Sequence, residues 1–255
     1  MLKLLALAIL MAASPGAYAA SYDFSGNLAE HFDQIQNSPF PSSSFQQDGK
    51  LAFHTNGVTM ASASEIYVYR NLLPTYQQSW LAQVDVQVPA SLYMQVPASN
   101  DAWASAMLIA FIRDGQGTLT HGISIDLEPD HPMGNQYWAG VWGDEETTWD
   151  VATSDIAGTI WLSFDAGTKV LSAYSAHGTL LTVDIDDPTT SWGMGAEDRF
   201  HIAIGFDAEN MYVGSNEALT IDNFSVQAVP EPETYALMIA GLGLVGLAVQ
   251  RRKPQ

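Results

Sequence analysis

The sequence predicts an all-β domain, built as a sandwich of two antiparallel sheets. Apolar residues recur with a period of two rather than 3.6, most clearly at Trp80, Ala82, Val84, Val86 and Val88. The predicted strands are short, and turn sequences such as Asp165-Ala-Gly-Thr168 separate them. Before residue 234 the only helical signal is a turn near Leu28–Phe32. Strands of this number and spacing are typical of two-sheet sandwiches.

The first 19 residues are predicted to be a secretory signal peptide. Lys3 precedes an apolar run over residues 4–13, and a Pro-Gly break follows. Ala17 and Ala19 are the small residues expected at the cleavage site. The mature chain therefore begins directly after Ala19, or one residue later.

Residues 20–228 are predicted to form one exported domain, since the sequence shows no internal repeat and no linker. The expected strands are 51–54, 66–70, 80–88, 107–113, 123–128, 137–142, 159–164, 170–175, 180–185, 200–206 and 219–226. Further turns are expected at Asp114-Gly-Gln-Gly117, Asn56-Gly57 and His177-Gly178.

Charge and cysteine content exclude some partners. Lys and Arg number 9 against 28 Asp and Glu, a formal net charge of −19. Such a charge repels phosphate backbones, which argues against nucleic acid as a partner and favours divalent cations. The chain has no cysteine, so packing must stabilise the domain without disulfides.

The segment Ser124–Glu128 is the one candidate for catalysis. In a strand, Ser124, Asp126 and Glu128 share one face, which sets the two carboxylates about 7 Å apart. Paired carboxylates can cleave glycosides. The alternative is an acidic pair on a solvated sheet face.

Three tryptophans are candidate sugar platforms, because the apolar faces of sugars stack on exposed rings. Trp138 and Trp142 precede an acidic loop at residues 143–150, and Trp161 lies on the opposite strand face from Ile160 and Leu162. If the aliphatic face is the core, Trp161 lies on an outer surface of the sandwich. The alternative is a core role for most of these rings.

Several segments resemble concanavalin A-like lectin and glucanase jelly rolls: Tyr22–Leu28, Asp48–Leu51, Gly158–Asp165, Lys169–Ser172 and Leu219–Val226. The resemblance implies a jelly-roll fold but no activity. Asp126 and Glu128 also match the last two members of the catalytic signature of laminarinase-type enzymes. Ser124 stands where that signature has a nucleophilic Glu, and a hydroxyl does not replace a carboxylate in a retaining mechanism.

Residues 229–255 combine Pro230-Glu231-Pro232, an apolar helix at about 234–250, and Arg251 and Arg252. This order resembles the PEP-CTERM sorting signal. The resemblance implies an exosortase that cuts near the prolines, after transient anchoring in the inner membrane, and moves the protein to the cell surface or extracellular matrix. The basic end is predicted to be cytoplasmic. An ordinary single-pass anchor is the alternative.

A structural Ca²⁺ ion is predicted where the first and last strands meet, with Asp23 and Asp222 among its ligands, by resemblance to sandwich carbohydrate modules. Other oxygen atoms would have to complete six to eight ligands. No other cofactor is indicated.

Two function classes remain. The first is a non-catalytic surface or matrix protein that binds polysaccharide or is structural in a biofilm, and the incomplete carboxylate set favours it. The second is a secreted glycoside hydrolase or lyase.

Overall fold

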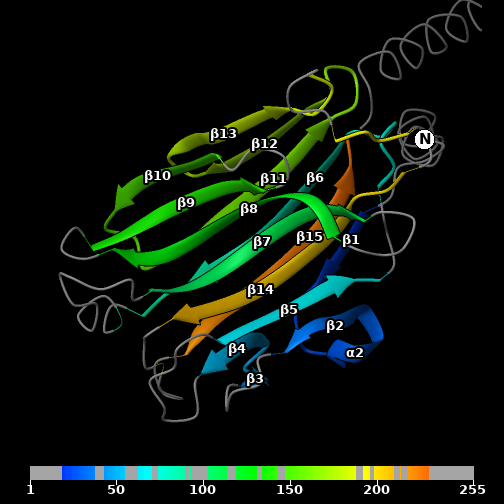
Figure 1. Cartoon of the computed structure of the whole chain (residues 1–255). Helices are drawn as coiled ribbons and strands as arrows, with labels where there is room; N and C mark the ends of the chain where they lie inside the picture. Colours follow the sequence, from blue (N-terminus) through cyan, green and yellow to red (C-terminus); the bar gives the residue numbers. More distant parts are fainter. Residues whose placement is uncertain are drawn as a thin grey trace, which may run out of the picture.

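Two antiparallel sheets packed face to face make up the domain, as predicted (Figure 1). The computed structural model describes residues 19–37, 43–54, 63–70, 74–89, 92, 103–113, 119–130, 134–142, 147–187, 192–195, 198–209, 213 and 218–229.

The eight-stranded sheet runs in the order β13-β12-β11-β6-β15-β4-β3, and β1 pairs with β15 beside it. Its strands are β1 (Ala19–Tyr22), β3 (Ser43–Gln47), β4 (Lys50–His54), β6 (Trp80–Gln87), β11 (Ala157–Asp165), β12 (Val170–Ser175), β13 (Gly178–Asp184) and β15 (Leu219–Ala228).

The seven-stranded sheet runs in the order β10-β9-β8-β7-β14-β5-β2. Its strands are β2 (Phe32–Asn37), β5 (Ala63–Tyr69), β7 (Trp103–Arg113), β8 (Leu119–Asp130), β9 (Gly134–Trp142), β10 (Thr147–Thr153) and β14 (His201–Glu209).

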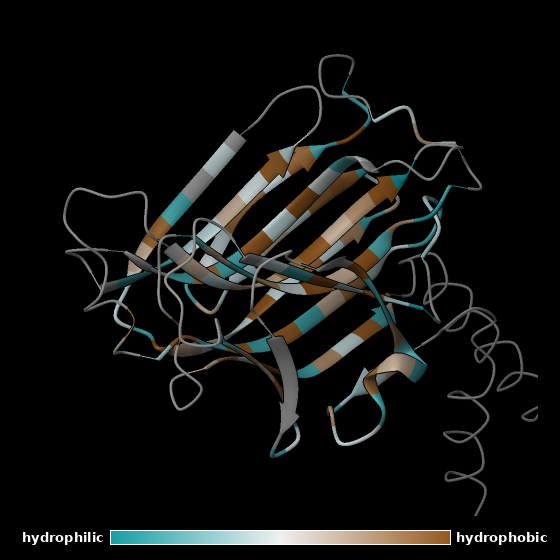
Figure 2. Cartoon of the chain, turned by 60° about the horizontal axis from the view of Figure 1, so that its bottom comes forward, coloured by the Kyte–Doolittle hydropathy of each residue, from teal (hydrophilic) through white to brown (hydrophobic). Residues whose placement is uncertain are grey.

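The core lies between the sheets because alternate residues of each strand point inward. Along β6, Trp80, Ala82, Val84 and Val86 are buried, and the residues between them are partly exposed. Figure 2 shows the same alternation as brown and pale or teal bands along the strands. Burial of this alternating apolar face fixes the register of each strand, since a slip by one residue would turn the apolar set to solvent.

The two ends of the domain lie together. Ala19 at the start of β1 is paired with Gln227 near the end of β15. The backbone N–H of Val229 donates to the carbonyl of Ser79 at 2.8 Å, so the chain is held in place up to that residue. Between β1 and β2, the one-turn helix α2 (Leu28–His31) begins at Asn27.

The predicted strands are confirmed, with longer bounds for most. The structure adds β1, β2, β3 and β10, which the sequence analysis did not predict. The Asp165–Thr168 hairpin and the turn at His177 are confirmed. The turns predicted at 114–117 and 56–57 lie outside the described residues. Strands β7 and β8, which precede and follow residues 114–117, form an antiparallel pair, as a hairpin requires.

Residues 1–18 of the predicted signal peptide and the segment from Pro230 onward, with its predicted membrane helix, also lie outside the described residues. Within the described part of the chain, no helix has the length and apolar character needed to cross a membrane.

Candidate functional site

The predicted acidic segment lies on the outer face of the seven-stranded sheet, the face turned away from the core. In β8, Ile125 and Leu127 are fully buried in the core. Ser124, Asp126 and Glu128 alternate with them and lie on the other side of the strand. The predicted division of this strand into two faces is therefore confirmed.

Strand register brings other predicted residues beside the two carboxylates. Asp126 lies between Trp138 of β9 and Met107 of β7. Glu128 lies opposite Gln136 of β9, whose side-chain amide donates a hydrogen bond to it. The structure thus places Asp126, Glu128 and Trp138 next to one another on one surface.

Trp138 and Trp142 lie on the same face, each over a glycine. A Cβ atom added to Gly122 would lie 2.1 Å from Cζ2 of Trp142, and one added to Gly140 would lie 2.1 Å from Cη2 of Trp138. Each indole therefore occupies the space that the side chain of any residue other than glycine would need at position 122 or 140. Both side chains are half-buried, so each indole keeps part of its surface exposed.

Asp126 is buried and incompletely hydrogen-bonded. Its residue is 5% exposed, and its Oδ1 has no hydrogen-bond partner among the described residues. Burial raises the pKa of the Asp126 carboxyl well above its usual value, and the charges of Glu128 and Asp207 raise it further. Asp126 is therefore a proton donor at a pH where ordinary aspartates are ionised.

Asp207 and Ser105 belong to the same surface, and the sequence analysis missed both. The two residues are paired between β14 and β7. Burial raises the pKa of Asp207 to about 7. Ser105 is fully buried, and its Oγ has no hydrogen-bond partner within the described part of the chain. Alternation along β14 could have placed Asp207 on this face, but the sequence analysis predicted that the strand ends at Phe206.

Another part of this face is apolar. A second hydrophobic cluster, separate from the core, contains Val68, Met107, Ile109, Phe111 and Ala203, with Ile66 and Trp142 packed against it. The His201 ring stacks on Phe111 with centroids 5.2 Å apart. Burial and then the charge of Arg113 lower the pKa of His201, so this ring is neutral at pH 7. An acidic row and an apolar row therefore adjoin on one sheet face.

Ser124 occupies an interior position of this surface. It is paired with Ile109 on one side and Gly140 on the other, and it is 7% exposed. The face therefore has no carboxylate at the position of the laminarinase-type nucleophile. Its groups can stack on a sugar, accept hydrogen bonds from hydroxyls and, through Asp126, donate a proton.

Trp161 is on the other sheet, away from these residues. It lies in β11 on the outer face of the eight-stranded sheet, stacked on Tyr174 with centroids 5.5 Å apart. Its indole N–H donates to Oε1 of Gln83 at 3.1 Å. The structure therefore separates the three predicted tryptophans into two surfaces.

The predicted calcium ligands lie where the first and last strands meet. Asp222 is paired with Asp85 of β6, and Asp23 follows β1. Oδ1 of Asp23 accepts hydrogen bonds from the backbone N–H and the hydroxyl of Ser25, at 3.1 and 2.7 Å. Among the described residues, no group of three or more His, Asp or Glu side chains could hold a metal ion. The calcium ion stays a prediction.

The residues predicted for processing fall at or beyond the limits of the described chain. Ala19 is the first residue of β1, and Ala17 precedes it. Pro230, Glu231, Pro232, Arg251 and Arg252 all follow the last described residue, Val229.

Residues 228–253 match the PEP-CTERM protein-sorting motif. This segment carries the prolines and the basic end identified above, and it marks an exported protein that is sorted to the cell surface. No curated protein matches the chain.

Solved structures of concanavalin A-like lectins and glucanases share the fold. A variant of LamA from Z. galactanivorans, in complex with laminaritriose and laminaritetraose, has a TM-score of 0.51 at 12% identity and covers 82% of this chain and 97% of its own. Winged bean acidic lectin, complexed with methyl-α-D-galactose, also has a TM-score of 0.51 at 12% identity, covering 83% and 98%. SCLam, a non-specific endo-β-1,3(4)-glucanase, has a TM-score of 0.51 at 10% identity, covering 85% and 92%. At these identities the likeness shows the fold, a jelly-roll sandwich, and no activity.

Proposed function

We propose that this protein is an exosortase substrate, displayed at the cell surface or in the extracellular matrix, that binds polysaccharide without cleaving it. The binding surface is the outer face of the seven-stranded sheet, with Trp138 and Trp142 as the stacking platform. Asp126 and Glu128 hydrogen-bond to sugar hydroxyls there.

One observation carries this proposal: two indoles lie over glycines on the same face as a carboxylate pair. A ring held against a sheet has already lost most of its rotamer freedom, so little further entropy is lost on binding. The ring then removes apolar sugar surface from water, at about 25 cal/mol per Å². Hydrogen bonds between sugar hydroxyls and the protein replace hydrogen bonds to water, so they add little to the free energy of binding.

These contributions predict weak binding by one domain. Many copies on one surface would then bind a long polymer through avidity. The net charge of −19 predicts that a neutral polymer binds better than an anionic one, unless a divalent cation bridges the two.

The binding test compares the full-length protein with Trp142→Ala and with Thr182→Ala, an exposed control on β13 of the other sheet. We expect Trp142→Ala to weaken binding to neutral polysaccharides about tenfold, equivalent to about 1.4 kcal/mol, and Thr182→Ala to leave it unchanged. Polyuronate should bind only when Ca²⁺ is present. Equal binding by the wild type and Trp142→Ala would exclude this platform.

Sorting has a separate test. An exosortase that cuts near Pro230–Pro232 would release the basic end from the surface form. We expect mass spectrometry of the surface form to find a C-terminus near residue 230. Recovery of Arg251 in that form would contradict processing at the motif.

A secreted glycoside hydrolase or lyase is the second candidate. The observation in its favour is the buried, readily protonated Asp126 close to Asp207, whose pKa of about 7 leaves it partly ionised at neutral pH. An acid and a carboxylate are the pair that inverting glycosidases use. Release of reducing ends from a panel of polysaccharides, abolished by Asp126→Asn, would establish this function instead of non-catalytic binding.

A further inference from the structure

The outer face of the eight-stranded sheet carries a row of side chains that spans five strands. Paired positions run from Tyr174 of β12 through Trp161, Gln83 and Ser225 to Ser21 of β1. Every one of these positions alternates with core residues, so all five side chains face away from the core. The row therefore forms a continuous polar and aromatic strip on the surface opposite the candidate site.

Trp161 is fixed within this row. Its ring is nearly parallel to that of Tyr174, with an interplanar angle of 7°. The hydrogen bond from its N–H to Gln83 holds the ring on the other side. Both rings are half-buried, so part of each stays exposed beside the polar residues.

The neighbouring row contains an irregularity that places a side-chain amide on the surface. Between Asp222 and Ser225 the pairing of β15 with β6 shifts register, and Asn223 in this bulge has φ 51°. Bulges often redirect a side chain, and asparagine tolerates this backbone conformation better than most residues. Here the bulge turns the Asn223 amide toward Asp85, and Nδ2 donates to Oδ2 of Asp85 at 2.8 Å.

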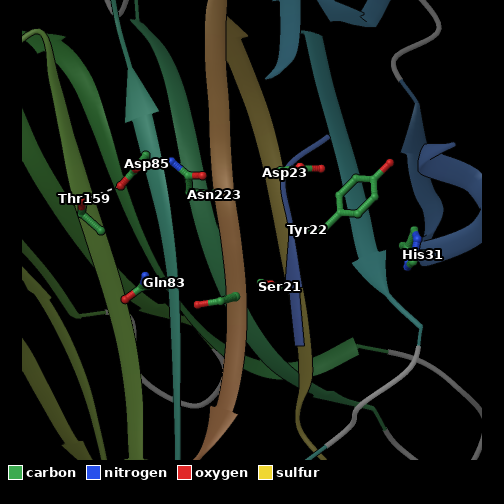
Figure 3. Close-up of a pocket in the computed structure, with 9 residues that line it drawn as sticks. Ser21, Tyr22, Asp23, His31, Gln83, Asp85, Thr159 and Asn223 are labelled. Carbon is green, nitrogen blue, oxygen red and sulfur yellow. Dashed lines mark hydrogen bonds between the residues drawn. The ribbon is translucent and has the colours of Figure 1, made fainter. Parts of the chain in front are cut away.

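Asp85 is hydrogen-bonded to residues of both neighbouring strands, β11 and β15. Its Oδ1 accepts a hydrogen bond from the hydroxyl of Thr159 at 2.5 Å. Figure 3 shows Thr159, Asp85 and Asn223 in sequence across β11, β6 and β15, with Gln83 below them. The hydrogen bonds fix the orientation of these polar groups before any ligand arrives.

These residues line a groove with a volume of about 770 Å³. It continues past β1 to Asp23, and to Tyr22 and His31, whose rings are tilted against each other with centroids 4.6 Å apart. A groove of this volume matches known small-molecule sites. Among the described lining residues there are two carboxylates and no lysine or arginine. Phosphates and uronates would be repelled, whereas hydroxyl groups find amide, hydroxyl and carboxylate partners.

We propose that this groove is a second binding site for a neutral sugar chain, which hydrogen-bonds to Asp85, Asn223 and Gln83 in the groove and extends onto Trp161, which lies beside the lining residue Gln83. The site does not depend on binding at the seven-stranded sheet. Cross-linking does rest on the proposed function, because a single domain can join two polymer chains only if it has one site on each outer face.

The test measures binding of the full-length protein to a panel of neutral sugars, including laminaritetraose and methyl-α-D-galactoside, by calorimetry. The variants are Trp161→Ala, Asn223→Gly, Trp142→Ala, the double variant Trp161→Ala/Trp142→Ala, and the control Thr182→Ala. Asn223→Gly removes the amide and keeps a residue that accepts positive φ, so it tests the groove even if Trp161→Ala fails to fold.

We expect two binding events in the wild type. Trp161→Ala and Asn223→Gly should each weaken one event about tenfold, Trp142→Ala should weaken the other, and the double variant should lose both. Mixed with a long neutral glucan, the wild type should form aggregates by light scattering, and each single tryptophan variant should not.

The outcomes distinguish the two sites. If Trp142→Ala abolishes all binding, or if Trp161→Ala and Asn223→Gly change nothing, the groove is not a site and the proposed function stands. If Trp161→Ala abolishes all binding and Trp142→Ala changes nothing, the groove is a site and the platform on the seven-stranded sheet is not. If the wild type binds nothing in the panel, both are wrong.

Discussion

The carboxylates on the two outer faces of the sandwich differ in their burial and hydrogen bonding. On the seven-stranded sheet, Asp126 and Asp207 are largely buried, and one oxygen of each has no hydrogen-bond partner within the described residues. On the eight-stranded sheet, both oxygens of Asp85 accept hydrogen bonds. Burial disfavours the charged form of a carboxyl group and raises the pKa of both Asp126 and Asp207, although a hydrogen bond from the backbone N–H of Ala208 partly offsets this at Asp207. The first face should therefore respond to pH in the neutral range.

Replacing Asp207 tests this difference most strongly. The pKa of Asp207 rises from 3.8 to about 7 on folding, so the folded state holds a proton that the unfolded chain has lost. Its stabilising effect is complete below pH 3.8 and is lost as the pH rises through about 7. We expect Asp207→Asn to raise the free energy of unfolding by about 1–3 kcal/mol near pH 8 and to change it little near pH 4.

Urea unfolding at both pH values measures this effect. The control is Thr182→Ala on the other sheet, which removes no titratable group and should leave the free energy of unfolding nearly unchanged at both pH values. A stabilisation by Asp207→Asn that is equal at both pH values would contradict proton uptake at this carboxyl.

Filling the space above a glycine tests the packing of the indoles. In Gly140→Ala the new Cβ would overlap the Trp138 ring, and the ring has to move. We expect a loss of about 1–3 kcal/mol in stability and weaker sugar binding at this face. Gly195→Ala is the control, because its Cβ would make only an ordinary contact, 3.6 Å from Oδ2 of Asp198. Thermal melts should separate the two variants, and identical melts would show that the indole adapts freely.

Asp85→Asn should have a smaller effect on stability. The amide can still accept a hydrogen bond through its oxygen, but its NH₂ group cannot accept the second one from Asn223 or Thr159. We expect a loss of about 0.5–1.5 kcal/mol in the free energy of unfolding at pH 7. Thr182→Ala, on the same sheet and away from the groove, should stay within about 0.5 kcal/mol of the wild type. A loss for Asp85→Asn no larger than that of Thr182→Ala would show that the two hydrogen bonds to Asp85 do not stabilise the domain.

Calcium is expected to have the smallest effect. An ion bound by Asp23 and Asp222 in the native state alone would raise stability according to RT ln(1 + [L]/Kd). With so few carboxylates the affinity is low, so we expect EDTA to lower the melting temperature by about one or two degrees. Asp23→Asn should remove that difference. An unchanged melting temperature on adding EDTA would exclude the ion.

Strong alternation was enough to predict most of the fold. Strands such as β6 and β8 show it over several residues. Burial of their apolar side chains favours an extended conformation and decides which face of the strand points to the core. Strands β2 and β3 are rich in Gln, Ser and Asn and lack that alternation. They lie at one edge of each sheet, where only one neighbouring strand constrains their sequence.

The candidate site could be predicted only in part, because local sequence gives faces but not neighbours. Alternation placed Asp126 and Glu128 together, but it did not resolve which way Trp138 and Trp142 point. It could not bring Asp207 to Asp126, since β14 and β8 are separated in sequence and meet only through β7. Nor could it assign Trp161 to the other sheet, because strand order is set by tertiary pairing.

The position of β15 has a mechanical consequence for a protein displayed outside the cell. This strand pairs with β6 along one edge and with β4 and β1 along the other, and the sorting segment follows it directly. Tension applied through that segment would pull along the axis of β15. The backbone hydrogen bonds on both edges are then sheared together rather than opened one after another from an end. A domain anchored in this way would resist being torn open by flowing water.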